Sequence, residues 1–150
     1  MSELRELYQS VILDHSKRPR NFCEPQGANR TADGFNPFCG DKITLYLELE
    51  DDVVKDVGFF GSGCAISMAS ASLMTQSIKG KSVAYARQLF DSFHELVVGD
   101  SGEGADSEKL GKLVALGGVR EFPVRVKCAT LAWHTLQSAL VGTGEVAKTE

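Results

Sequence analysis

Residues 43–60 read ITLYLELEDDVVKDVGFF, and this stretch decides the fold. Along residues 43–50 apolar side chains alternate with Thr, Tyr and Glu, which is the period of a half-buried strand. Asp51 and Asp52 form the turn, and residues 53–60 return as a second run rich in valine and phenylalanine. Because strands with so short a connection pair antiparallel, the stretch predicts a β-hairpin.

The sequence before this hairpin predicts one helix and a long connection. Apolar residues recur at helical spacing over residues 3–16, and Pro19 ends the helix because the residue before a proline avoids the helical region. Residues 20–40 are rich in Gly, Pro and Asn. They predict a connection that contains a short strand near residues 28–34.

Helices are predicted after the hairpin. Gly80 suits the end of the first, the Ser82 side chain can cap the second, and Pro123 suits the start of the last. The predicted ranges are residues 64–79, 82–96, 110–116 and 123–140, followed by a tail over 142–150 that we expect to fray. Strands followed by helices predict an α+β fold, with a small antiparallel sheet of about three strands packed against several helices. The length of 150 residues fits a single domain, residues 1–150.

Charge and hydropathy argue against two kinds of partner. The formal net charge is −4, and no stripe of Lys and Arg indicates a nucleic-acid interface. No stretch approaches the ~18 apolar residues of a membrane-spanning helix, and the charged N-terminus lacks the apolar run of a signal peptide. We therefore expect a cytoplasmic protein that binds neither nucleic acid nor membranes. In that reducing compartment several cysteines favour metal or sulfur chemistry over disulfides.

Three of the four cysteines lie in contexts that favour metal binding. Cys39 lies in NPFCGD on a predicted turn, and the carboxylate of Asp41 follows two residues later. Cys64 follows GSG at a predicted helix start, where free backbone N–H groups favour an anionic thiolate. Cys128 lies in RVKCA near the start of the last helix. Three thiolates and one carboxylate make the four ligands that zinc prefers.

Other residues with suitable chemistry receive weaker assignments. Arg125 lies three residues before Cys128 and is a candidate cation that neutralises the site or pairs with Asp41. Cys23, in NFCEP, matches none of the ligand contexts, and we expect it to be structural or incidental. For His134, on the last predicted helix, packing is favoured over metal binding.

The chain resembles a known family in four segments. NPFCGD, GSGCAISMASAS and RVKCATLAW are similar to the three cysteine motifs of the U-type iron–sulfur cluster assembly proteins, which include the IscU-type and NifU N-terminal-domain relatives. The opening LYQSVILDHSKRPRN resembles that family too, so the resemblance covers most of the chain. Lys127 stands where the IscU-type pattern has a His, and extra sequence lies around residues 97–119. Both features resemble the SufU branch, with a SufU/IscU-like fold.

Resemblance to that branch implies a zinc site and a role as sulfur acceptor. The implied partners are a SufS-like cysteine desulfurase and other iron–sulfur assembly proteins. Cys39 lies on the most turn-rich segment, so we expect its thiolate to leave the metal and attack the desulfurase persulfide. The protein would then be a sulfur-transfer partner of the desulfurase rather than a stand-alone enzyme.

Two alternative functions remain open. The first is a scaffold that assembles a [2Fe–2S] cluster on Cys39, Asp41, Cys64 and Cys128. The presence of Lys127 in place of the His of the IscU-type pattern weakens the case for this function. The second is a purely structural zinc domain, against which Asp41 argues because structural sites are usually built from Cys and His. A dithiol oxidoreductase is disfavoured because the sequence has no C-x-x-C pair.

Overall fold

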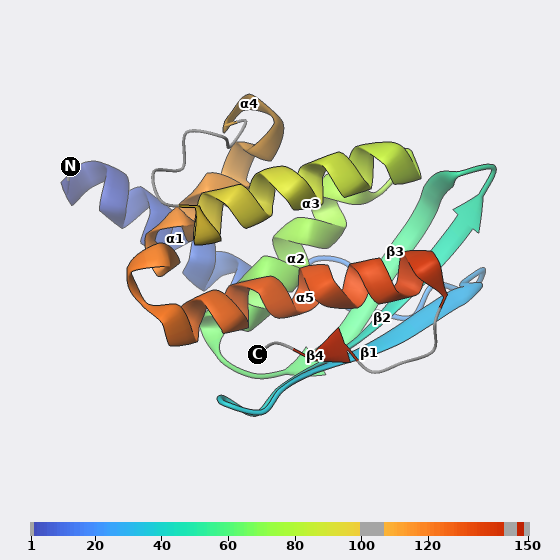
Figure 1. Cartoon of the computed structure of the whole chain (residues 1–150), viewed down its shortest axis with the longest axis horizontal. Coiled ribbons are helices and arrows are strands. Elements are labelled where there is room, and N and C mark those ends of the chain that lie inside the picture. Colours follow the sequence, from blue (N-terminus) through green and yellow to red (C-terminus); the bar gives the residue numbers. More distant parts are fainter. Residues whose placement is uncertain (1, 100–106, 143–146, 149–150) are drawn as a thin grey trace.

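The predicted hairpin forms one side of the sheet, whose strand order is β3-β2-β1-β4, in the computed structural model of the chain, which describes residues 2–99, 107–142 and 147–148 (Figure 1). β2 (Asp41–Glu50) pairs antiparallel with both β3 (Val53–Ser62) and β1 (Arg30–Asn36). Asp51 and Asp52 have φ angles of 52° and 62°, the left-handed values that a type I′ hairpin turn requires at both central residues. The expected antiparallel sheet is confirmed.

The expected helices are also present, so the α+β prediction is confirmed. The helices are α1 (Ser2–Lys17), α2 (Ala65–Ile78), α3 (Val83–Val98), α4 (Ser107–Leu110), the 3-10 helix η1 (Gly111–Glu121) and α5 (Pro123–Val141). The Ser82 side chain accepts a hydrogen bond from the Tyr85 backbone N–H and caps α3, as expected. Pro123 occupies the first turn of α5, and Gly142 ends that helix in the left-handed conformation.

Two helices cover one face of the sheet, and two more lie outside them (Figure 1). α5 packs on β1 and β2, α2 packs on β3 and α5, α3 packs on α5, and α1 packs on α2. The alternation in β2 buries Ile43, Leu45 and Leu47, as its sequence predicted. On the helical side, Trp133 stacks on Phe93 with ring centroids 4.6 Å apart. The small residues of α2 allow α5 to approach closely.

Two elements differ from the prediction. The helical stripe expected to end at Gly117 instead continues as η1 through to Glu121. In the tail, which was expected to fray, Ala147–Lys148 forms β4, a fourth strand parallel to β1. The remainder of the tail and most of the segment between the helices predicted over residues 82–96 and 110–116 lie outside the described residues.

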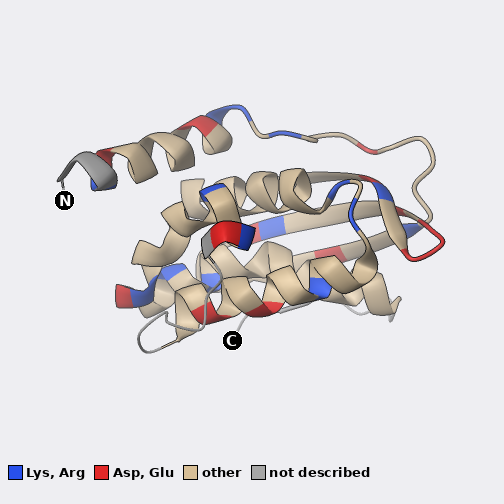
Figure 2. Cartoon of the chain, turned by 90° about the horizontal axis from the view of Figure 1, so that it is seen from above, with Lys and Arg blue, Asp and Glu red and all other residues tan. Residues whose placement is uncertain are grey.

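The charged residues do not form a continuous basic surface. Acidic residues gather at the β2–β3 turn, where Lys55 pairs with Glu48 and Glu50, whereas Lys and Arg are scattered over several elements (Figure 2). In the part of the chain that the structure describes, none of the helices is both long enough and apolar enough to cross a membrane.

Candidate metal centre

Three of the four predicted ligands meet at one end of the sheet. Cys39 lies on the turn between β1 and β2, Asp41 is the first residue of β2, and Cys128 lies in the second turn of α5. One ligand atom from each residue lies within 4.8 Å of the other two, and the Sγ atoms of Cys39 and Cys128 are 3.4 Å apart. In Figure 1 the β1–β2 turn lies beside the N-terminal part of α5. Residues 89 positions apart thus reach a common point.

The three residues differ sharply in exposure. Cys128 and Asp41 are fully buried, whereas Cys39 is exposed on its turn. Phe38, the neighbour of Cys39, is 63% exposed. A molecule that approaches this end of the protein therefore reaches Cys39 before the other two.

Both carboxylate oxygens of Asp41 are fixed by hydrogen bonds. The backbone N–H of Cys64 donates to Oδ1 at 2.9 Å, and the side-chain amide of Asn36 donates to Oδ2 at 3.0 Å. Asn36 Nδ2 also lies 3.6 Å from the Cys128 Sγ, and Asn36 Oδ1 accepts from the backbone N–H of Phe38 at 3.2 Å. The sequence interpretation did not identify Asn36, although it precedes Pro37 in the NPFCGD motif.

Cys64 adjoins this group from the start of α2. It is the N-cap residue of that helix, its side chain makes no capping hydrogen bond, and its backbone N–H contacts Asp41. Its thiol interacts with Cys128, although the group within 4.8 Å comprises Cys39, Asp41 and Cys128 alone. Gly63 permits the close approach, because a Cβ there would collide with Asp41 Oδ1.

The electrostatics of the cluster favour a shared cation. Burial raises the pKa of the Cys128 thiol far above its ordinary range, and hydrogen bonds with Cys39, Asp41 and Cys64 raise it further. Several acidic groups this close cannot all ionise at neutral pH unless a positive charge compensates them. Sulfur and carboxylate donors suit zinc, which binds thiolates and accepts an oxygen ligand. The donor set therefore fits a metal ion.

Arg125 lies in the first turn of α5, three residues before Cys128, and its predicted role stays a prediction. It is exposed and lines a cavity of about 640 Å³ together with Ala65 and Ile66, the first residues of α2 after Cys64. Among the described residues, no ion pair joins Arg125 to Asp41.

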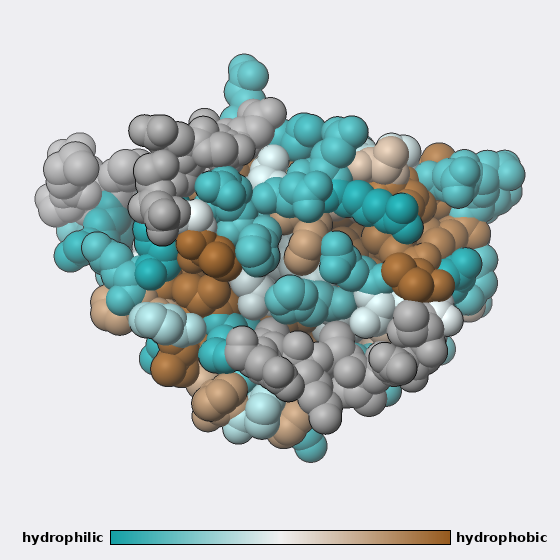
Figure 3. All heavy atoms as spheres, viewed as in Figure 1, coloured by the Kyte–Doolittle hydropathy of each residue, from teal (hydrophilic) through white to brown (hydrophobic). Residues whose placement is uncertain are grey.

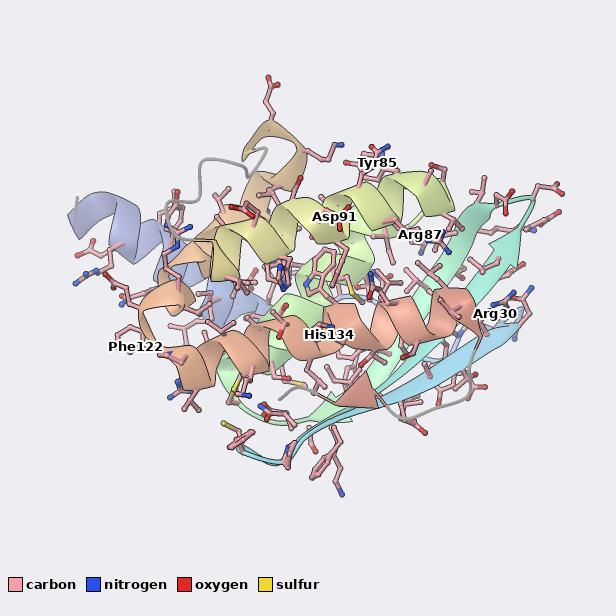
Figure 4. The ribbon with its side chains drawn as sticks, viewed as in Figure 1. Arg30, Tyr85, Arg87, Asp91, Phe122 and His134 are labelled. Carbon is pink, nitrogen blue, oxygen red and sulfur yellow. The ribbon has the colours of Figure 1, made fainter. Side chains whose placement is uncertain are left out.

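The other singled-out residues lie elsewhere. His134 is in the middle of α5 and faces Phe90 of α3, with ring centroids 5.8 Å apart. In Figure 4 it is labelled well along the helix from Phe122, which marks the start of α5. Cys23 is exposed on the segment before β1. Lys127, which replaces the His of the IscU-type pattern, places its ammonium 4.5 Å from the centre of the Phe38 ring. A cation is therefore held next to the turn that carries Cys39.

Comparisons with known proteins agree with the motif resemblance. The zinc-dependent sulfurtransferase SufU of Bacillus subtilis is 45% identical over 142 residues, which cover 93% of this chain and 92% of the relative. The iron–sulfur cluster assembly scaffold protein IscU of Streptococcus pyogenes is 42% identical over 140 residues, which cover 93% of this chain and 86% of that protein.

Solved structures and a family model complete the comparison. The crystal structure of a putative iron–sulfur cluster assembly scaffold protein for the SUF system from Fervidobacterium islandicum has a TM-score of 0.81 at 35% identity, over 87% of this chain and 93% of that one. The family model of the NifU-like N-terminal domain matches residues 7–129. The chain belongs to the NifU-like N-terminal domain family.

Proposed function

We propose that this protein acts in iron–sulfur cluster assembly as a zinc-dependent sulfur acceptor, which receives persulfide sulfur on Cys39. The observation that carries the proposal is the Cys39–Asp41–Cys128 cluster, in which one thiol is exposed and the other ligand groups are buried. The similarity to a protein named zinc-dependent sulfurtransferase supports it. The proposal places the protein in the cytoplasm, where thiols stay reduced.

Four residues of this chain would hold the ion: Cys39, Asp41, Cys64 and Cys128. Asp41 is fixed by the Cys64 backbone and the Asn36 amide, and Cys128 is fixed in α5, so these residues form the rigid part of the site. A bound zinc ion keeps its thiolate ligands deprotonated at neutral pH. Arg125, exposed beside α2, is the proposed positioning cation for the approaching partner or for the anionic cluster.

The exposed thiol of Cys39 has the position that sulfur transfer requires. Its thiolate would attack the outer sulfur of a persulfide on the desulfurase cysteine. A bond then forms between Cys39 Sγ and that sulfur, while the bond to the desulfurase cysteine breaks and that cysteine leaves as a thiolate. No external oxidant or reductant is needed, because one persulfide replaces another.

Apolar side chains around the turn offer a surface for the desulfurase. Phe38, Phe122 and Val124 are exposed at this end of the protein, where the β1–β2 turn and the start of α5 come together. Exposed aromatic and aliphatic residues beside a reactive group are typical of protein contact sites. The carboxylate of Asp41 in the cluster argues against a purely structural zinc domain, since structural sites are usually built from Cys and His.

Cluster assembly on the same residues is the second candidate. It is favoured by the carboxylate of Asp41 among the thiols and by relatives that are named scaffold proteins. The metal content of protein purified without oxygen separates the two functions. Zinc alone in colourless protein supports the sulfur-acceptor role, whereas iron and sulfide in coloured protein support the scaffold role.

The decisive test compares two exposed cysteines. Cys39→Ser should abolish both the stimulation of a cysteine desulfurase and the gain of one sulfur atom on this protein, measured by mass spectrometry. Cys23→Ser is the matched control, because Cys23 is also exposed but lies outside the cluster. Zinc is measured on both variants by elemental analysis. If Cys39→Ser accepts sulfur as well as Cys23→Ser does, Cys39 is not the acceptor.

A further inference from the structure

A second cavity borders α5, and Lys127, whose ammonium lies over the Phe38 ring, is one of its lining residues. It has a volume of about 400 Å³, is open to solvent, and is lined by the end of α3, by η1 and by the first half of α5. None of the cysteines and no acidic side chain from residues 2–99, 107–142 or 147–148 lines it. Its size is within the range of small-molecule sites. In Figure 3 an apolar area lies between the C-terminal end of α3 and the start of α5.

Arg120 is the feature of this cavity that most needs an explanation. The Nη2 group of its guanidinium donates to the carbonyl of Leu96 at 2.9 Å, but its Nε–H is buried without a hydrogen-bond partner. In the described parts of the chain no carboxylate forms an ion pair with it. Guanidinium groups that leave solvent are normally paired, and each buried donor without a partner is costly. An anionic ligand would supply the missing acceptor.

The other polar groups around the cavity also favour an anion. His94 from α3 and His134 from α5 line it, and both rings lie near Phe90, at 5.9 and 5.8 Å between centroids. Burial lowers the pKa of His134, and the neighbouring His94 lowers it further, so the ring is neutral and offers an N–H donor rather than a charge. The start of α5 forms another part of the wall, and its first turn contains no acidic residue and no side-chain cap. This part of the wall therefore adds no negative charge to the cavity.

We propose that this cavity binds a small organic anion, whose carboxylate or phosphate group is held by Arg120 together with His94 and His134. The carbon part of the ligand would lie against Val97 and Val126, which form part of the apolar wall. Guanidinium groups recognise both oxyanions through paired N–H donors. The proposal does not depend on metal binding or on sulfur transfer, because none of the proposed metal ligands takes part.

Three probes of similar size test the proposal and identify the anion. Phenyl phosphate and benzoate each carry an anionic group on an apolar ring, whereas benzyl alcohol has the ring without the charge. Calorimetry should show saturable binding of at least one anion and none of benzyl alcohol. Binding should also raise the pKa of His134, followed by NMR of the imidazole, because an anion favours the protonated ring. The anion that binds more tightly identifies the ligand as a phosphate or a carboxylate.

Matched arginine variants locate the site. Arg120→Gln should weaken anion binding by about tenfold or more, since a charge-assisted hydrogen bond is lost. Arg87→Gln, which removes an exposed arginine of α3 outside the cavity, should leave binding unchanged. Circular dichroism shows whether Arg120→Gln folds. If it does not, His94→Ala replaces it as the cavity variant, because His94 lines the cavity and is exposed. The proposal is wrong if neither anion shows saturable binding, or if benzyl alcohol binds as tightly as the anions. It is also wrong if the folded cavity variant binds the anion with the same affinity as Arg87→Gln.

Discussion

Asn36 connects three parts of the candidate metal centre. Because amides are uncommon zinc ligands, its role is to orient the ligands rather than to bind the ion. It reaches the carboxylate of Asp41, the thiol of Cys128 and the backbone of Phe38 from one buried position. Groups that orient metal ligands contribute strongly to metal affinity even without touching the ion. At this site the buried amide of Asn36 contacts both the Asp41 carboxylate and the Cys128 thiol, and so sets the distance between these two groups.

Replacing Asn36 should therefore weaken metal binding. In Asn36→Ala the Asp41 Oδ2 loses its donor, and we expect the zinc affinity to fall about 10- to 100-fold. Competition with a chromogenic chelator measures the affinity. Asn29→Ala is the control, since Asn29 also bridges backbone groups of the sheet but at Leu49, near the opposite end of β2. Equal affinities for the two variants would contradict the role of Asn36.

A second test concerns the approach of Gly63 to Asp41. The Cβ of Gly63→Ala would collide with Asp41 Oδ1, so the carboxylate must shift from the position in which it accepts the Cys64 N–H. We expect purified Gly63→Ala to retain less zinc than Gly118→Ala, whose Cβ meets no atom within 4 Å. Elemental analysis after dialysis measures the difference. Full zinc retention by Gly63→Ala would show that the site tolerates a displaced carboxylate.

The candidate ligands could be predicted from sequence because each lies in a local context with a known preference. Cys39 is on a turn and Cys64 is at a helix start, and both placements are confirmed. Their mutual distances could not be predicted, because they depend on how α2 and α5 pack on the sheet. The role of Asn36 was missed for the same reason, as two of its contacts lie in other elements.

Among the helices, α1 is attached to α2 through a buried polar contact. His15 Nδ1 lies 2.7 Å from Ser72 Oγ, and the same oxygen accepts the backbone N–H of Arg20 at 2.8 Å. Burial lowers the pKa of His15, and the charge of Arg20 lowers it further, so the ring is neutral at pH 7. The Ser72 hydroxyl thus contacts both α1, through His15, and the segment after α1, through the backbone of Arg20.

Loss of this hydroxyl should destabilise the fold. Ser72→Ala leaves the His15 nitrogen and the Arg20 N–H without partners, at a cost of about 1–3 kcal/mol in the free energy of unfolding. Ser77→Ala is the control on the same helix, because Ser77 bonds only to the carbonyl of Leu73 in its own turn. Urea denaturation of both variants measures the difference. Equal stabilities would show that α1 is held by apolar contacts alone.

Elements with strong local patterns were predictable, and those that depend on neighbours were not. The alternation of β2 and the cap at Ser82 identified a strand and a helix. The 3-10 helix η1 passes Gly117 because Leu116 and Val119 are buried on either side of that glycine and Arg120 bonds to α3. The two-residue β4 exists through its pairing with β1, so its own residues carry no strand pattern.

At the scale of the whole molecule, the candidate metal centre joins segments that are distant in sequence. It connects the turn before β2, the start of α2 and the second turn of α5, where helices and sheet meet. The motifs predicted the residues of this junction, but the contrast between exposed Cys39 and buried Cys128 became visible only in the folded chain. A bound ion would hold these segments together in the native state and would have no equivalent site in the unfolded chain.

Metal removal should therefore lower the stability of the entire fold. Free zinc at about 100 times its dissociation constant stabilises the native state by about 2.7 kcal/mol. For a chain of this length, that corresponds to roughly 5–10 °C in Tm. Calorimetry before and after chelation measures the change, and Cys23→Ser should show the full shift because its thiol lies outside the cluster. Cys39→Ser should show a smaller one, since three ligands bind the ion less tightly than four. An unchanged Tm of the unsubstituted protein after complete zinc removal would mean that the ion does not link the sheet to the two helices.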